Sequence, residues 1–470
     1  MTPHMSSSPT RPPQPGIRLH VDLDHDVRPH RNAKIEAHLR VDVDADGVPT
    51  DLPAVELAVI IAVDVAEAHR AAVRHALPAA LKALPDRISF AVLGSGPEPV
   101  LCYPRGGEEW AVADREQRRR AVFVAGSLPL HRDGPRPAGY APWVARARTL
   151  LADRPLSVRH LVLITDGSSA ARGTSRALAE ELDRCAGQFT CDVFAVGADW
   201  DPDPLLTLAE RLHGTADFAD GGLDRSITAA IQRLRRVHAP LLPIDVTVRP
   251  CVRQVSISEK APRPHRLGGL PQPGRPIRWS FPTYQWEQGR RDYLLTLVAD
   301  ADGDPLETTL QFAMVSIGRH VHHPVVARWH LPDSSPPQAP AGADSVRALN
   351  ATGRMRGALR KGLVALEAHK RQAAEDWLGQ AARLAARLGS DWVLEEIRTV
   401  ADVEDAAAGR VRLRPVDARS LGPLILRAVS GPGSLPADAV AARPGPRCGA
   451  CGTPAGSEAR HCITCGEKLL

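Results

Sequence analysis

The chain lacks any long apolar segment. Its longest run of apolar residues, Leu57 to Val63, is far shorter than the roughly 20 residues that a membrane-spanning helix needs. Residues 1–15 are polar and rich in Pro and Ser, and they contain no apolar stretch of the kind found in signal peptides. We therefore expect no membrane insertion and a cytoplasmic location.

A strong excess of charge and the common catalytic motifs are also missing. The 59 basic and 54 acidic residues leave a formal net charge of only +5, which does not indicate a nucleic-acid partner. Neither the phosphate-binding pattern Gly-x-x-x-x-Gly-Lys-Ser/Thr nor the nucleophile pattern Gly-x-Ser-x-Gly occurs. No Cys/His arrangement suggests a nucleophile, so we expect a binding protein and not an enzyme.

What is present indicates several folded domains. The chain has 470 residues, more than one hydrophobic core usually supports, with 43% hydrophobic and 24% charged residues. Residues 17–23 and 35–43 alternate apolar and polar positions, which predicts strands with one buried face. Residues 55–237 alternate short apolar runs with helix-like stretches, which predicts a largely parallel sheet covered by helices on both sides. Alternation with Pro- and Gly-rich turns returns over residues 243–316 and predicts a β-sandwich.

We expect the strands before residue 54 to pair with that sandwich, so that the α/β domain is an insertion. Beyond a Pro/Ser-rich linker, two apolar stripes at helical spacing flank the turn His369-Lys370-Arg371, which predicts a hairpin that resembles one tetratricopeptide unit. A third helix is predicted from Trp392 to Ala407. The predicted boundaries are a disordered N-terminus (1–16), β-strands pairing with the sandwich (17–54), the α/β domain (55–238), the β-sandwich (239–330), a linker (331–344), a helical domain (345–428), a second linker (429–446) and a C-terminal cysteine module (447–470).

Four of the eight cysteines form two Cys-x-x-Cys pairs at the C-terminal end. Cys448 and Cys451 are followed ten residues later by Cys462 and Cys465, and a glycine follows each pair. Each pair can direct two thiolates at one metal ion, and two pairs complete a closed tetrahedral shell that suits structural zinc. A chance pair of redox motifs is the alternative. The spacing resembles the short zinc ribbons at the ends of many bacterial proteins.

Three strand ends in the α/β region carry a further resemblance. One apolar strand ends at Asp64, a second ends in Thr165-Asp166-Gly167, and a third, over residues 192–197, precedes an acidic loop and a helix. In this order and spacing they resemble a von Willebrand factor A domain. The whole arrangement is similar to actinobacterial proteins of that family with a trailing β-domain, a helical segment and a zinc ribbon. The resemblance implies a doubly wound α/β fold that binds protein ligands at the C-terminal ends of its strands.

The metal-ion-dependent adhesion site of that family is degenerate in this sequence. The family binds Mg²⁺ through Asp-x-Ser-x-Ser, a threonine from a later loop and a second aspartate. Here Ala66 and Ala68 stand where the two serines would follow Asp64, and residues 105–148 contain no threonine. The surviving pair, Asp64 and Asp166, would hold Mg²⁺ poorly, because this ion demands near-ideal octahedral oxygen ligands.

We therefore expect no Mg²⁺ at this site. Asp64 and Asp166 are expected to cap the helices that begin beside them. Glu67 is the alternative source of a metal-binding oxygen.

Two other groups of residues invite a functional interpretation, and for both we favour a structural one. The histidines at positions 320, 322, 323 and 330 have no accompanying carboxylate pattern, and we expect a solvated edge there. Cys185 and Cys191 flank a turn into a strand and are expected to be buried, inert thiols.

The leading hypothesis is a protein-interaction adaptor with an unidentified protein partner. The alternative is a nucleic-acid-associated regulator that uses the zinc ribbon as its reader, although that module carries few basic and aromatic residues. The sequence does not identify the partner, the pathway or the oligomeric state.

Overall fold

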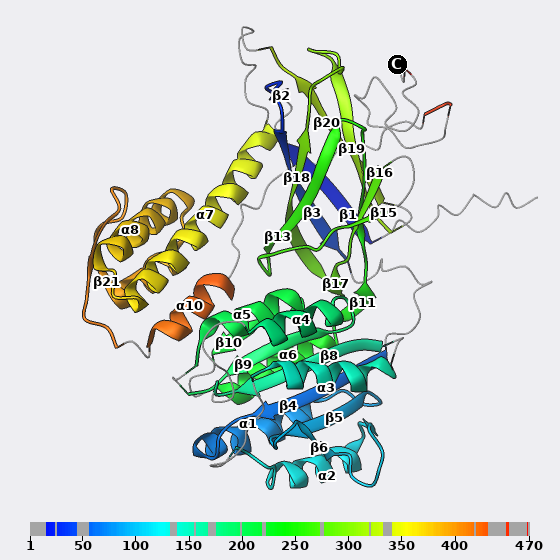
Figure 1. Cartoon of the computed structure of the whole chain (residues 1–470), viewed down its shortest axis with the longest axis vertical. Helices are drawn as coiled ribbons and strands as arrows, with labels where there is room; N and C mark the ends of the chain where they lie inside the picture. Colours follow the sequence, from blue (N-terminus) through cyan, green and yellow to red (C-terminus); the bar gives the residue numbers. More distant parts are fainter. Residues whose placement is uncertain are drawn as a thin grey trace, which may run out of the picture.

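The computed structural model describes residues 16–23, 26–44, 56–131, 139–154, 157–167, 175–197, 200–218, 222–272, 277–318, 321–331, 341–417, 420–430, 448–450 and 468. Figure 1 shows a part built from strands above a sheet that is flanked by helices, with a group of helices beside both. No helix in these ranges is long and apolar enough to cross a membrane.

The lower part is an α/β domain built on a mostly parallel sheet. Its strands are β4 (Glu56–Asp64), β5 (Ser89–Gly94), β6 (Val100–Tyr103), β7 (Ala111–Val112), β8 (Ser157–Thr165), β9 (Thr190–Ala195) and β10 (Ala216–Phe218). The strand order is β10-β9-β8-β4-β5-β6, in which β10 to β5 are parallel and β6 is antiparallel at the edge. The central strand β4 is buried from Leu57 to Asp64, which explains its unbroken apolar sequence.

Helices cover both faces of this sheet, as the sequence predicts. They are η2 (Glu67–His69), α1 (Arg70–Ala83), α2 (Arg115–Ala125), α3 (Ala141–Ala152), α4 (Arg176–Cys185), α5 (Pro202–Arg211) and α6 (Leu223–Leu234). Successive side chains of a strand point to opposite faces. The odd-numbered residues of β4 pack in one core with α1, α2 and α6, and the even-numbered residues pack in the other with α3, α4 and α5. The domain is therefore doubly wound.

The upper part consists of two sheets that share one core. Its strands are β1 (Ile17–Leu23), β2 (Asp26–Val27), β3 (Ala33–Val43), β12 (Ile244–Val248), β13 (Val252–Ala261), β14 (His265–Arg266), β15 (Leu270–Gln272), β16 (Ile277–Phe281), β18 (Gly289–Ala299), β19 (Thr309–Ile317) and β20 (Val321–Trp329). The sheet orders are β1-β3-β18-β13-β14 and β15-β16-β12-β19-β20-β2. We call this part the β-domain.

The start of the chain belongs to the β-domain. Strand β3 pairs antiparallel with β18 over its whole length, from Ala33 opposite Ala299 to Val43 opposite Gly289. In Figure 1 these first strands, drawn in blue, lie among green strands that follow the α/β domain in sequence. The α/β domain is thus inserted between β3 and the later strands of the β-domain. A short ribbon of β11 (Val237–Leu241) and β17 (Tyr284–Glu287) lies at the junction.

The histidine segment belongs to a strand of the β-domain. His322 and His323 lie in β20 and pair with β19 on one side. On the other side β2 pairs only with Arg328 and Trp329, and both histidine side chains are half-buried. Three consecutive polar or Pro residues, ending at Pro324, hide the alternating pattern of this strand. The expected solvated edge therefore holds in part: His322 and His323 lie on an edge segment and stay partly exposed, whereas His330 is buried.

The remaining helices form a separate group that contacts both the α/β domain and the β-domain. They are α7 (Ala341–Glu367), α8 (Arg371–Leu388), α9 (Asp391–Val400) and α10 (Leu421–Ser430). The predicted hairpin is formed by α7 and α8. The predicted third helix is too long, because α9 stops at Val400 and the chain continues as a hairpin of β21 (Ala401–Asp405) and β22 (Arg410–Leu413). That hairpin turns at Gly409, which has a φ of +72°.

Candidate functional site

The two aspartates of the degenerate adhesion site meet where the sequence places them. Asp64 is the last residue of β4 and lies in register with Thr165, the last residue of the neighbouring parallel strand β8; Asp166 follows directly. The carboxyl ends of parallel strands lie at one edge of a sheet, so both carboxylates face the same region. Asp64 is fully buried, and Asp166 is 5% exposed.

A histidine that the sequence analysis overlooked occupies the space beside Asp64. The Nε2 nitrogen of His131 lies 2.7 Å from Oδ1 of Asp64, and the imidazole is also buried. Because a carboxylate can only accept, the Nε2–H of His131 is the donor. The backbone holds the ring there: His131 N donates to Val65 O at 3.0 Å, and Glu67 N donates to His131 O at 2.8 Å.

Hydroxyl and amide groups engage the other oxygens of the site. The hydroxyl of Thr165 donates to Oδ2 of Asp64 at 3.1 Å, and Ala66 N donates to Oδ2 of Asp166 at 2.6 Å. The hydroxyl of Tyr140 lies 3.4 Å from that of Thr165. Burial raises the pKa of Tyr140 well above its ordinary value, so the phenol stays protonated.

The helix-capping role expected of the two aspartates was wrong. Helix α1 has no side-chain cap, and α4 is capped by Ser175, whose hydroxyl accepts from Leu178 N. Asp64 instead accepts hydrogen bonds from His131 and Thr165. Asp166 bonds to the backbone of Ala66, the residue before the short helix η2, and so joins the two strand ends.

These residues do not fit Mg²⁺. Both oxygens of Asp64 already have donors, Ala66 and Ala68 offer no side-chain oxygen, and Glu67 forms an ion pair with Arg70. The N–H of His131 lies beside Asp64, where the family would bring a cation, and a nitrogen that carries this hydrogen has no lone pair for a metal ion. Among the described residues, no group of three or more His, Cys, Asp or Glu side chains is placed to hold a metal.

The sequence offered a weak signal for this arrangement. Tyr140 follows Gly139 in the stretch where a threonine was sought, and its hydroxyl does reach the site through Thr165. His131 lies in the same loop region, but only its bridge to Ala66 brings it to Asp64, and no local pattern marks that bridge.

The predicted thiol positions divide into two groups. Cys185 and Cys191 are fully buried, as expected, and burial raises the pKa of the Cys185 thiol to about 12. Cys448 is described and is 2% exposed, whereas Cys451, Cys462 and Cys465 lie outside the described residues.

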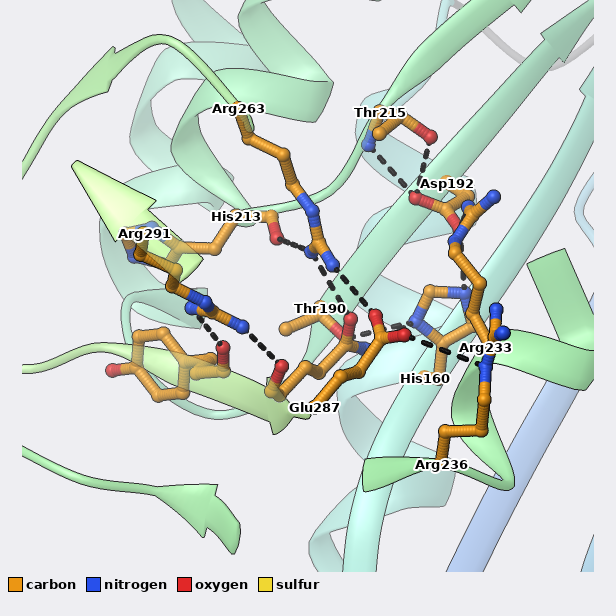
Figure 2. A network of polar contacts seen from close by, with 12 residues as sticks. His160, Thr190, Asp192, His213, Thr215, Arg233, Arg236, Arg263, Glu287 and Arg291 are labelled. Atoms are coloured by element: carbon orange, nitrogen blue, oxygen red, sulfur yellow. Dashed lines mark hydrogen bonds and ion pairs between the residues drawn. The ribbon is translucent and has the colours of Figure 1, made fainter. Parts of the chain in front are cut away.

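At the opposite ends of the strands, a polar network joins the α/β domain to the β-domain (Figure 2). Asp192 accepts hydrogen bonds from both the backbone and the hydroxyl of Thr215 at 2.8 Å and from Arg233 at 3.0 Å, and His160 lies 3.5 Å away. Burial alone would raise the pKa of Asp192, but the contacts with His160 and Arg233 hold it well below its ordinary value. Asp192 therefore remains an anion at the centre of the network.

The junction ribbon contributes β17 to this network, and the β-domain contributes the loop before β14. Gln285 donates to Thr190 and lies 3.1 Å from Nδ1 of His160. Arg263 reaches Gln285 at 3.2 Å. It also reaches Glu287 at 3.4 Å (Figure 2). Since His160 and Thr190 lie near the starts of β8 and β9, the β-domain is attached at the amino ends of the strands. The Asp64 site lies at the carboxyl ends, away from this attachment.

Comparisons with known proteins agree with this fold. Residues 57–218 match the family model described as von Willebrand factor type A domain, and this part of the chain is such a domain. No curated protein matches the chain by sequence.

Two solved structures resemble nearly the whole chain. A von Willebrand factor type A protein from Catenulispora acidiphila superposes with a TM-score of 0.75 at 21% identity, covering 90% of this chain and 98% of that one. The ArnB paralog VWA2 from Sulfolobus acidocaldarius gives a TM-score of 0.51 at 10% identity, covering 89% and 100%. At these identities the likeness shows the fold alone.

Proposed function

We propose that this chain is a non-enzymatic protein-interaction adaptor that binds its partner without a metal ion at the Asp64 site. The observation that carries the proposal is the 2.7 Å contact between His131 and Asp64, both buried, at the strand ends where domains of this family bind ligands. The imidazole N–H satisfies the carboxylate that would otherwise need a cation.

The position of the site supports partner binding. The β-domain is attached to the amino ends of β8 and β9, so it does not cover the carboxyl ends where Asp64 and Asp166 lie. Loops at the ends of strands are also where α/β domains place their ligands. The β-domain therefore does not stand between a partner and this edge of the sheet.

Titration with Mn²⁺ tests the metal-free site. We expect no heat of binding at Asp64 in the natural chain up to about 1 mM, the weak end of specific affinities. The matched variant replaces His131 with Ala and restores both serines, A66S and A68S, which frees one carboxylate oxygen and adds two hydroxyl ligands. We expect this variant to bind Mn²⁺. Heat from the natural chain that disappears in Asp64→Asn would overturn the proposal.

Partner capture gives the second test. Full-length protein, tagged and retrieved from its host, should retain a partner in EDTA when that partner docks at the strand ends. Binding that survives EDTA in the natural chain but is lost in Asp166→Ala would support the proposal. Binding that requires added Mg²⁺ would contradict it.

The C-terminal zinc ribbon belongs to the same proposal as a structural module. Its support is the spacing of Cys448, Cys451, Cys462 and Cys465 in the sequence, because four thiolates in two close pairs are the donor set that zinc prefers. A closed shell of four protein ligands leaves no position for substrate, so the zinc would stabilise the fold of the module and take no part in catalysis. A cytoplasmic location remains part of the proposal.

A further inference from the structure

A cleft of about 300 Å³ lies between the β-domain and helix α7, with α10 at one end. One wall is formed by β13 and β14, where Ser258 lies directly opposite Arg266 in the strand register. The other wall is a stripe of α7 residues at helical spacing, which includes Gly353, Arg356 and Gly357. The cleft therefore lies at a junction of three separate parts of the chain.

Positive charge dominates this cleft. Lys260 on β13 forms no hydrogen bond or ion pair within the part of the chain that the structure describes, and Arg266, which lies opposite Ser258, is exposed. Arg356 is 6% exposed, donates to Val429 O at 3.0 Å and packs over Trp392. The charge of Arg360 is balanced by Asp203 at 3.1 Å.

The one acidic residue in the lining does not neutralise these cations. Glu259 precedes Lys260 on β13, and successive side chains of a strand point to opposite faces. The Glu259 side chain is 3% exposed and accepts from Arg263 N at 3.2 Å. Burial lowers the pKa of Lys260, although the charge of Glu36 opposes this shift, and burial lowers the pKa of Arg356 to about 10. The cleft is thus short of negative charge.

Two glycines keep the cleft open on the helix side. A Cβ atom built on Gly357 would meet no atom within 4 Å, and one built on Gly353 would lie 3.9 Å from Nζ of Lys260. Glycine inside a helix costs about 1 kcal/mol relative to alanine, and no packing contact requires it here. The space next to the ammonium group is therefore available to a ligand.

We propose that this cleft binds a small molecule through a phosphate group. Ammonium and guanidinium groups are the usual partners of phosphate oxygens, and Ser258 adds a hydroxyl donor. The volume is at the lower end of the range for small-molecule sites, which suits a compact phosphorylated compound. Because strands of the β-domain and helix α7 form the two walls, the ligand would tie the helical part to the β-domain.

Calorimetric titration of the full chain at low ionic strength tests this proposal, with pyrophosphate and adenosine monophosphate as probes. We expect at least one of them to bind with a dissociation constant below about 1 mM. Lys260→Gln should weaken binding about tenfold or more, because it removes one charge-assisted contact. Gly357→Leu, which keeps every charge but fills the space, should also weaken it. Arg354→Gln changes an exposed charge of α7 outside the cleft and should bind as the natural chain does.

The two probes separate the possible sources of the phosphate. Binding of pyrophosphate alone indicates an inorganic ligand, and binding of the nucleotide indicates a phosphorylated metabolite; both support the proposal if Lys260→Gln and Gly357→Leu weaken them. Unchanged thermal unfolding of these two variants without ligand would show that they fold. No heat with either probe up to about 10 mM, or equal binding by Lys260→Gln, would overturn the proposal.

Discussion

The Nδ1 nitrogen of His213 lies 3.2 Å from the Nε2 nitrogen of His265, across the junction between the α/β domain and the β-domain. Nδ1 of His265 lies 2.8 Å from the carbonyl oxygen of Arg263 and must donate to it. In a neutral imidazole the other nitrogen is then an acceptor, so His213 donates to His265. The contact needs one donor and one acceptor, so it cannot form when both nitrogens carry a hydrogen atom.

The stability of the chain should fall between pH 7 and pH 4.5 because of His213. Burial, with the nearby charges of His265 and Arg263, lowers the pKa of His213 from 6.5 to about 3. Below pH 6.5 the unfolded chain takes up a proton that the folded chain excludes, so acid favours unfolding. The loss should reach about 2 to 3 kcal/mol at pH 4.5, measured by chemical denaturation at several pH values.

His213→Gln removes this titration and should make the pH dependence shallower by that amount. His75→Gln is the matched control, because the His75 side chain is 79% exposed, and it should leave the slope unchanged. The pKa of Asp192 is lowered as well, so its protonation destabilises the fold only below its ordinary value of 3.8 and does not enter this window. An unchanged slope in His213→Gln would contradict the assignment.

His131→Ala should destabilise the α/β domain strongly. It leaves Oδ1 of Asp64 buried without its 2.7 Å donor, and removing one partner of a buried pair costs about 3 to 5 kcal/mol. His131→Gln retains an N–H donor and should cost less. The double variant His131→Ala with Asp64→Asn should recover part of the loss, because no charge remains buried. Urea denaturation followed by circular dichroism measures all three; equal stability of His131→Ala and the natural chain would refute the pairing.

Gly214→Ala should prevent tight packing beside the junction. A Cβ atom at this position would lie 1.8 Å from the carbonyl oxygen of Cys191, so the backbone of β9 would have to move. We expect a loss of about 3 kcal/mol or more, at the upper end of overpacking effects. Gly268→Ala is the control, since a Cβ atom there meets nothing within 4 Å and should change stability by less than about 0.5 kcal/mol. Denaturant midpoints of the two variants give the comparison.

Local sequence patterns predicted the α/β core well, because a strand that is buried on both faces has an unbroken run of apolar residues. Strand β4 needs apolar residues at odd and even positions alike, and its sequence contains little else. The sequence of helix α2 has no comparably clear apolar pattern. Only Ala121, Val124 and Ala125 of this helix are buried, so its apolar face is too narrow to stand out from the charged residues around it. Its clearest signal was Asp114, which caps the helix by accepting from Gln117 N at 2.6 Å.

The candidate site was only half predictable for a different reason. Asp64 and Asp166 could be located because each ends a recognisable strand, and parallel strand ends meet. His131 reaches the site through a single bridge to Ala66, and Gln285 reaches His160 from 125 positions away. Such contacts depend on how domains pack, and one sequence carries no periodic signal for them. The absence of the two serines could be read from the sequence. The presence of an imidazole beside Asp64 could be seen only in the folded structure.

The zinc proposal leads to the last prediction. Protein purified without oxygen should contain about one zinc ion per chain, because two Cys-x-x-Cys pairs provide one closed set of four thiolates. Cys462→Ser removes one of the four ligands and should release the metal, as measured by elemental analysis or a chromogenic chelator. Cys251→Ser is the control: this half-buried thiol lies in the β-domain, far from the pairs in sequence, and its loss should leave the zinc content unchanged.

A module of about 23 residues has little apolar core of its own, so the metal would supply most of its folding free energy. The unfolding midpoint of the remaining domains should therefore be the same in Cys462→Ser and the natural chain, because the Pro- and Gly-rich segment from residue 431 to 446 predicts little coupling between them. Zinc-free protein from an anaerobic preparation, or full zinc content in Cys462→Ser, would refute the assignment of these thiolates.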